Sequence, residues 1–105
     1  MATLKPLWGP VQPGTTDTSR YTGATNGSIV TGLWITNTTG AAATISYGLN
    51  GTAATAANCL ICNYSLGAAA SMYLPAKWFL RNTDVIHDIQ GTSSAITTTA
   101  FGVER

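Results

Sequence analysis

The sequence predicts an all-β protein, an antiparallel β-sandwich of the jelly-roll or immunoglobulin-like kind with about seven to eight short strands. Three observations lead to this prediction. Strand-like segments and turns alternate at a spacing of ~8–12 residues. No segment shows a convincing helical period. Threonine is abundant, which suits the solvent faces of strands. The 105 residues are enough for one domain with a single core.

The chain is expected to begin with an extended, proline-rich docking arm over residues 1–20, followed by a single sandwich domain over residues 21–105. Pro6, Pro10 and Pro13 argue against a regular helix or a central strand in the arm. A disordered tail would rarely carry large apolar side chains, yet the arm carries Leu4, Leu7, Trp8 and Val11. Two placements remain open: Trp8 folds back onto its own domain, or the arm docks on a neighbouring subunit.

The strands are expected in this order. SIVTGLWIT (28–36) is β-rich and ends in the turn NTTG. ATISYGL (43–49) alternates, with Ile45 and Tyr47 on one face. The loop NGTAATAAN precedes the strands CLICNYSL (59–66) and SMYL (71–74), and PAKWFLRNT is expected to be a connection. DVIHDIQ (84–90) and AITTTAFGV (95–103) complete the set. The predicted core consists of Ile29 or Val30, Leu33, Ile35, Ile45, Tyr47, Leu60, Leu80, Val85 or Ile86, Ile89 and Phe101.

The low charge of the chain excludes some functions and favours association. Only 9% of the residues are charged and the formal net charge is +1, so no basic face for nucleic acid is available. No signal peptide precedes the prolines, and no apolar run approaches the ~20 residues of a membrane helix. We therefore expect synthesis in a cytoplasm, no membrane partner, and a surface that partners cover.

The cysteines form the spacing CLIC within an expected strand. Residues three apart on a strand point to opposite faces, so Cys59 and Cys62 are expected to be two unlinked, partly buried thiols. A metal site would need two more ligands, and the single histidine is not enough. No metal or other cofactor is expected.

The densest run of charge, RNTDVIHD (81–88), raises the question of an active site. On a strand, His87 and Asp88 point to opposite faces, and Asp84 lies roughly 13 Å from Asp88 at ~3.3 Å per residue. That is too far for a carboxylate pair acting on one bond. Asp84 is expected to accept backbone N–H bonds at a turn, and His87 to be a partly buried polar residue. The charged run is therefore not expected to form an enzyme active site.

The order of SIVTGLWITNTTGAAATISYGL, CLICNYSL, the turn LRNTDVI and the closing AITTTAFGVER resembles small β-sandwich virion structural proteins of tailed bacteriophages. The resemblance covers residues 25–105. It implies a virion location and a non-enzymatic role, either as capsid decoration or minor capsid protein, or in the tail or fibre. It also implies homo-oligomers, often trimers, in contact with virion proteins such as the major capsid protein.

Attachment to the particle is expected through the arm and through oligomer contacts. The candidate interface residues are Leu4, Leu7, Trp8, Val11, Trp34 and Trp78. A second hypothesis is a carbohydrate- or receptor-binding module that stacks aromatic side chains on a surface glycan, with core or subunit packing as the alternative use of those side chains. The aromatic candidates are Trp34, Trp78, Tyr21, Tyr64 and Tyr73. A third is a free-standing scaffold or a small enzyme, which no particular residue supports.

Overall fold

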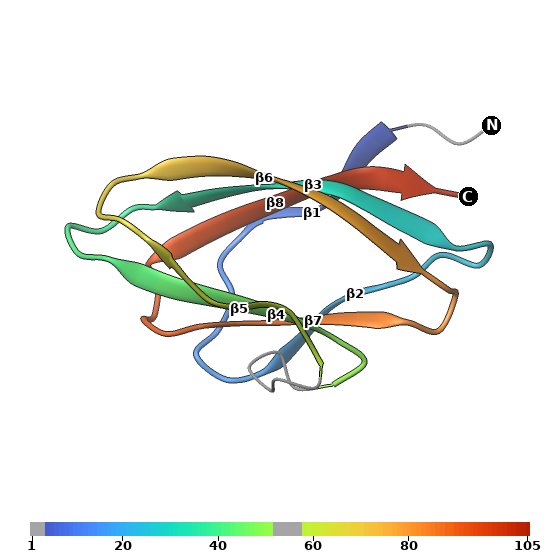
Figure 1. The fold of residues 1–105 in the computed structure, drawn as a ribbon, viewed down its shortest axis with the longest axis horizontal. Helices are drawn as coiled ribbons and strands as arrows, with labels where there is room; N and C mark the ends of the chain where they lie inside the picture. The colour runs from blue at the N-terminus through green and yellow to red at the C-terminus, as the bar shows by residue number, and fades with distance from the viewer. Residues whose placement is uncertain (1–3, 52–57) are drawn as a thin grey trace.

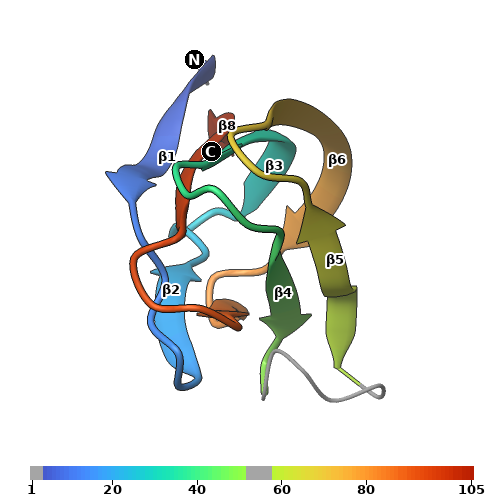
Figure 2. The same ribbon diagram turned by 90° about the vertical axis from the view of Figure 1, so that its left-hand side faces the viewer.

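The computed structural model describes residues 4–51 and 58–105 as two β-sheets packed face to face (Figures 1 and 2). Each sheet has four antiparallel strands, so the predicted antiparallel sandwich is confirmed. The strands are β1 (Leu4–Val11), β2 (Thr18–Thr22), β3 (Ser28–Asn37), β4 (Ala43–Leu49), β5 (Cys59–Leu66), β6 (Ser71–Leu80), β7 (Val85–Gln90) and β8 (Ile96–Glu104).

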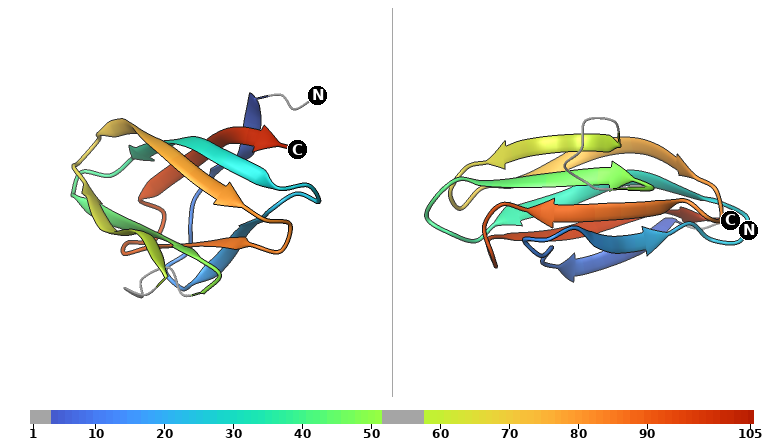
Figure 3. Two further views of the ribbon diagram at one scale, coloured as in Figure 1. Left: turned by 45° about the vertical axis from the view of Figure 1, so that its right-hand side comes forward. Right: turned by 90° about the horizontal axis from the view of Figure 1, so that it is seen from below.

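The two sheets have the orders β1-β8-β3-β6 and β2-β7-β4-β5. β1 and β2 each form an edge, one in each sheet, and β5 and β6 form the two opposite edges (Figure 3). Consecutive strands such as β1 and β2 therefore lie in different sheets, which ties the two layers together. The loop expected between the ATISYGL and CLICNYSL strands falls largely outside the described residues.

The core fills the space between the sheets and follows the two-residue alternation of the strands. In β3 and β4, Leu33, Ile35, Ile45 and Tyr47 are fully buried, as predicted. Of the two open pairs, Val30 and Ile86 are the buried members. The buried apolar residues are Trp8, Val30, Leu33, Ile35, Ala43, Ile45, Tyr47, Leu66, Leu80, Ile86, Ala95, Ile96 and Ala100.

Two residues expected in the core lie on outer faces instead. Phe101 pairs with Gly32, at a position that alternates with buried neighbours. Ile89 pairs with Ser46 on the outside of the other sheet. The prediction was wrong at these positions because an apolar residue on a strand does not reveal which face is covered.

Residues 4–22 are not separate from the sandwich as the arm hypothesis requires. β1 pairs with β8, β2 pairs with β7, and Trp8 is only 8% exposed. The prolines exclude a central strand but not an edge strand, because an edge strand has one side free of ladder hydrogen bonds. Pairing between β1 and β8 shifts register twice, after Pro6 and after Trp8. Of the two placements left open by the sequence, the fold-back of Trp8 is the one found.

The segment PAKWFLRNT, expected to be a connection, continues strand β6 as far as Leu80. Pro75 lies within it opposite Gly32, where the pairing of β3 with β6 is irregular. The reason is the same as for β1: β6 is an edge strand and tolerates a proline.

The two cysteines are joined in a disulfide, which corrects the prediction of free thiols. The Cα atoms of Cys59 and Cys62 lie 5.7 Å apart, whereas three steps of regular strand would span about 10 Å. β5 departs from regular geometry here, because its pairing with β4 shifts register twice and Asn63 has φ of 50°. The alternation rule fails at such an irregularity.

Candidate interaction surface

The charged run anchors a turn through Asp84. The Asp84 carboxylate accepts the backbone N–H of Arg81 and the side-chain amide of Asn50, each at 2.8 Å. The Arg81 guanidinium adds hydrogen bonds at 3.2 and 3.3 Å. These contacts, led by the Arg81 side chain, lower the pKa of Asp84 to about 2. The predicted role of Asp84 at the turn is confirmed.

Asp88 points into the sandwich and forms an ion pair that the sequence did not predict. Its side chain is fully buried and meets the Arg20 guanidinium, with Nε and Oδ2 2.6 Å apart. Burial raises the pKa of the Asp88 carboxyl, and Arg20 opposes that rise. Arg20 reaches the pair from β2 across the β2–β7 ladder. The pair therefore holds the N-terminal part of the chain to β7.

His87 points to the opposite face from Asp88, as predicted, and lies 2.8 Å from the Asp17 carboxylate through Nδ1. No serine or threonine hydroxyl of the described residues is hydrogen-bonded to His87. In residues 4–51 and 58–105 no group of three or more metal-ligating side chains comes together either. The arrangement supports a structural contact between β7 and the segment before β2.

A second polar cluster joins β1, β2 and β8. Glu104 accepts a hydrogen bond from the Tyr21 hydroxyl and lies 2.5 Å from Lys5 Nζ. The Tyr21 hydroxyl also contacts Ser28 Oγ at 2.9 Å. Burial, followed by the hydrogen bond to Glu104, raises the pKa of Tyr21 to about 12. Lys5 and the Tyr21 hydroxyl together lower the pKa of Glu104. Lys5 is therefore held by its own domain.

The outer face of the β1-β8-β3-β6 sheet carries an apolar surface made from cross-strand neighbours. One row crosses all four strands, because Leu4 pairs with Val103, Val103 with Ile29, and Ile29 with Phe79. A second row likewise runs from Pro6 through Phe101 and Gly32 to Pro75. A third joins Thr99, Trp34 and Tyr73. We call this surface the apolar face and define it by Leu4, Ile29, Trp34, Tyr73, Phe79 and Phe101.

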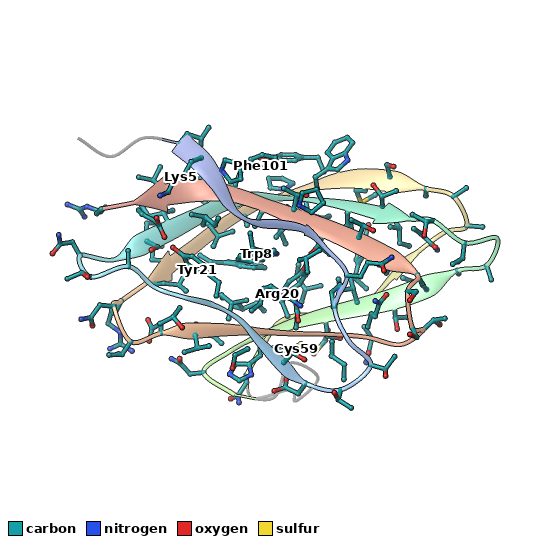
Figure 4. The ribbon with its side chains drawn as sticks, turned by 180° about the vertical axis from the view of Figure 1, so that it is seen from behind. Lys5, Trp8, Arg20, Tyr21, Cys59 and Phe101 are labelled. Carbon is teal, nitrogen blue, oxygen red and sulfur yellow. A yellow bond between two sulfur atoms is a disulfide. The ribbon has the colours of Figure 1, made fainter. Side chains whose placement is uncertain are left out.

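Large side chains on the apolar face are exposed to solvent. Phe79 is 70% exposed, Leu4 62%, Tyr73 48% and Trp34 47%. Figure 4 shows Phe101 on the outer side of the sheet and Trp8 between the sheets. Among the described residues, the paired outward positions of this sheet carry no charge, and Lys77, exposed between Pro75 and Phe79 on the edge strand β6, is the charged residue that shares the face. A monomeric protein rarely exposes a contiguous apolar patch of this kind without a use for it.

Trp34 and Tyr73 form an aromatic pair on the apolar face. Their ring centroids are 6.4 Å apart. The Tyr73 ring lies over Gly32, where a Cβ atom would come within 2.0 Å of the Tyr73 hydroxyl oxygen. A side chain at position 32 would therefore displace Tyr73. The glycine lets the ring lie flat against the sheet.

The outer face of the other sheet is more polar. Its paired outward positions include Ser19 beside His87, Thr44 beside Ser65, and Ser46 beside Ile89. The sandwich therefore has one apolar and one largely polar outer face. This difference singles out the apolar face as the candidate interaction surface.

An open hollow of about 560 Å³ lies beside the end of the apolar face. It runs between the turn before β3 and the end of β6, with Ile29 and Phe79 on one side and Arg81 and Arg105 also in its lining. Arg81 already pairs with Asp84. The hollow extends the candidate surface with polar and basic groups.

The residues predicted for the interface are divided between the surface and the core. Leu4 and Trp34 lie on the apolar face. Leu7, Val11 and Trp78 are half-buried against the core, and Trp8 is part of it. Sequence reasoning included Tyr73 among possible stacking residues, missed Phe79 as a surface residue and placed Phe101 in the core. Strict alternation from the outward-facing Trp34 would place Ile29 on the inner face. Ile29 faces outward because the pairing of β3 shifts register between Val30 and Gly32, and the sequence does not reveal that shift.

Comparisons with known proteins bear on the fold alone. No protein-family model matches the sequence, and no curated protein matches it either. Among solved structures, the chain is similar to one in the structure of infectious bursal disease virus, Gx strain, with a TM-score of 0.50 and 9% sequence identity. The similarity covers 98% of this chain but 30% of the viral chain. No helix of the described residues is long and apolar enough to cross a membrane.

Proposed function

We propose that this chain is a non-enzymatic structural protein of a virus particle, made in the host cytoplasm and incorporated into the virion. The observation that carries the proposal is the apolar face, which is four strands wide and carries Lys77 as its charged residue among those described, at the β6 edge. Such a face is more typical of a protein that is permanently part of an assembly than of a soluble enzyme. The charged groups that could act in catalysis are held in structural contacts.

The finer assignment is a decoration or minor capsid protein of a tailed phage that forms homo-oligomers and contacts the major capsid protein. The resemblance of residues 25–105 to phage β-sandwich proteins supports this finer assignment, whereas the fold similarity to a chain of infectious bursal disease virus supports the virion role alone. Attachment is assigned to the apolar face rather than to an N-terminal arm, because Trp8 is buried in its own domain.

Location in the particle can be tested with an antibody raised against the purified protein. Particles from lysed source cultures are banded on a density gradient, and the fractions are probed. The protein should band with the particles, and immunogold labelling should mark heads rather than tails. Label on tails would move the assignment to a tail or fibre protein. A protein that stays entirely in the soluble fractions would refute a virion role.

The exposed Trp34–Tyr73 pair favours one alternative, a glycan-binding module, because adjacent exposed rings can stack on a sugar. A glycan array separates the two functions. Saturable binding that is lost in Trp34→Ala and kept in Trp78→Phe would favour the module. Trp78 is the control because it lies half-buried against the core.

A further inference from the structure

We propose that the apolar face is a homodimer interface, in which two copies of this chain stack their β1-β8-β3-β6 sheets about a two-fold axis. The inference deepens the proposed function, because it names the surface through which the particle protein associates with itself. The inference depends on the proposed function only in assuming that the dimer occurs in a virion. The dimer itself is a property of the purified chain.

The size and flatness of the face indicate what kind of partner covers it. Four strands at ~4.8 Å spacing and up to ten residues long, with ~3.3 Å per residue, present roughly 600 Å² in projection. The protruding rings of Trp34 and Phe79 raise the accessible area further. A standard interface buries about 800 Å² on each partner. Only a partner as broad as another sheet covers this face, and stacked sheets pack about 10 Å apart.

The low charge of the face makes it compatible with a second copy of itself. In a two-fold interface the same patch is present on both sides, so any charge near the axis meets a like charge. The paired outward positions in the described part of this sheet carry none. Lys77 is exposed on the same side of β6 as Pro75 and Phe79, because its neighbours Ala76 and Trp78 pack against the core. Since β6 is an edge strand, the long Lys77 side chain can reach water at the rim of the stack.

The edges of this sheet oppose the other way in which sheets associate. An unpaired edge strand can add a strand from a second copy. β1 carries Pro6 and Pro10, and β6 carries Pro75 and Lys77, which are residue types that block or discourage edge pairing. Because both edge strands resist pairing with another strand and the apolar face is exposed, association through the face is favoured.

One flat patch also favours a dimer over a trimer. A two-fold pair covers the whole face at once, because the patch is complementary to its own copy. Three copies around an axis would each need two different contact surfaces. The outer face of the other sheet, with His87, Ser46 and Thr44, does not offer a second apolar one.

The test is sedimentation velocity of the untagged full chain from about 1 to 100 μM, at matched ionic strength. We expect a species of twice the 10.9 kDa chain mass. Phe79→Asp and Trp34→Ser should each raise the dimer dissociation constant at least ~30-fold, since both remove an anchor at the centre or end of the face. Ile89→Ser, on the outer face of the other sheet, should leave the constant unchanged within about twofold.

Circular dichroism and melting temperature show whether each variant is folded, and Phe79 and Trp34 are exposed enough to be replaced without unfolding. A wild-type chain that stays monomeric at 100 μM would overturn the inference and leave the face to another occupant, such as a glycan or a virion protein. A dimer that survives both face variants would also overturn it. Neither result changes the gradient test of the virion role, which can fail while the dimer stands.

Discussion

At the scale of single residues, the acidic side chains differ in how the fold treats their charge. Asp84 is held as a carboxylate by donors from Arg81 and Asn50, so folding favours its ionised form. Asp88 is buried deeply enough that the fold disfavours its charge despite Arg20. Two carboxylates four positions apart therefore contribute opposite slopes to the pH dependence of stability.

Replacing Asp84 by Asn should remove a stabilisation that is present above pH ~4, the usual pKa of aspartate. The folded-state pKa is about 2, so the wild-type advantage is complete above pH ~4 and is lost as the pH falls toward 2. Urea unfolding of both proteins from pH 5 to pH 2 measures this. The gap in unfolding free energy should shrink across that window. A gap that stays constant with pH would contradict the role given to Asp84.

Removing one partner of the buried ion pair should cost more than removing both. Asp88→Ala leaves the Arg20 guanidinium, 16% exposed, without its carboxylate, and should lower the free energy of unfolding by about 3–5 kcal/mol. The double variant Arg20→Met/Asp88→Leu should recover much of that loss because no charge is left buried. Urea melts at pH 7 give both values. A single-variant cost below ~1 kcal/mol would show that Arg20 is readily solvated.

At the scale of the elements, the sequence was informative where a strand alternates and lies inside a sheet. ATISYGL predicted β4 and its buried Ile45 and Tyr47 correctly. β1 and the second half of β6 were missed because Pro6, Pro10 and Pro75 were taken to end strands, whereas edge strands tolerate them. The apolar face was missed for another reason: it depends on which strands are neighbours, and β1, β8, β3 and β6 are distant in sequence.

Within β1, Trp8 is the residue that fixes the strand to the core. Its ring lies 5.8 Å from that of Tyr21 and 6.2 Å from that of Tyr47. Trp8→Ala should lower the free energy of unfolding by about 3–5 kcal/mol. Trp8→Phe should cost far less, since it keeps the ring contacts and removes Nε1, which is buried without a hydrogen-bond partner among the described residues. Denaturant melts of the two variants compare them. Equal costs would mean that the ring contacts contribute little.

Within β5, the disulfide should stabilise only modestly. It closes a loop with a sequence separation of 3, for which the chain-entropy relation gives about 2 kcal/mol. The variant Cys59→Ser/Cys62→Ser should therefore remain folded and lose about 2 kcal/mol or less. Amide hydrogen exchange should quicken in β5 and its partner β4, not in β3 or β8. A global loss of protection would show that the bridge supports more than an edge strand.

At the scale of the whole molecule, residues 4–22 complete both sheets. They supply one edge strand to each layer, and Arg20, Tyr21 and Lys5 join them to β7 and β8. The sandwich therefore depends on an N-terminal segment whose proline-rich composition is more typical of an extended arm. Trp8 of that segment is buried in its own domain and is not free to dock on a neighbour, whereas Leu4 remains exposed on the apolar face.

A chain that begins at residue 23 should therefore fail to fold as a stable sandwich. Its β7 and β8 edges would lose their partners and the core would lose Trp8. Circular dichroism and analytical sedimentation should report a largely unfolded or aggregated protein. Adding the peptide of residues 1–22 should restore β-structure, because an exposed edge accepts a matching strand. A soluble, cooperatively melting truncation would instead support the arm hypothesis.

The pairing of Leu4 with Val103 places the two ends of the described chain side by side, at one end of the molecule (Figure 3). That pair belongs to the row that ends at Phe79 on the apolar face. A carrier protein or a purification tag fused to either end will therefore emerge next to this face and shield it. Fusion at one terminus cannot be exchanged for fusion at the other to avoid the problem. A reporter that leaves the face clear belongs in a loop at the far end of the sandwich, such as the turn between β3 and β4.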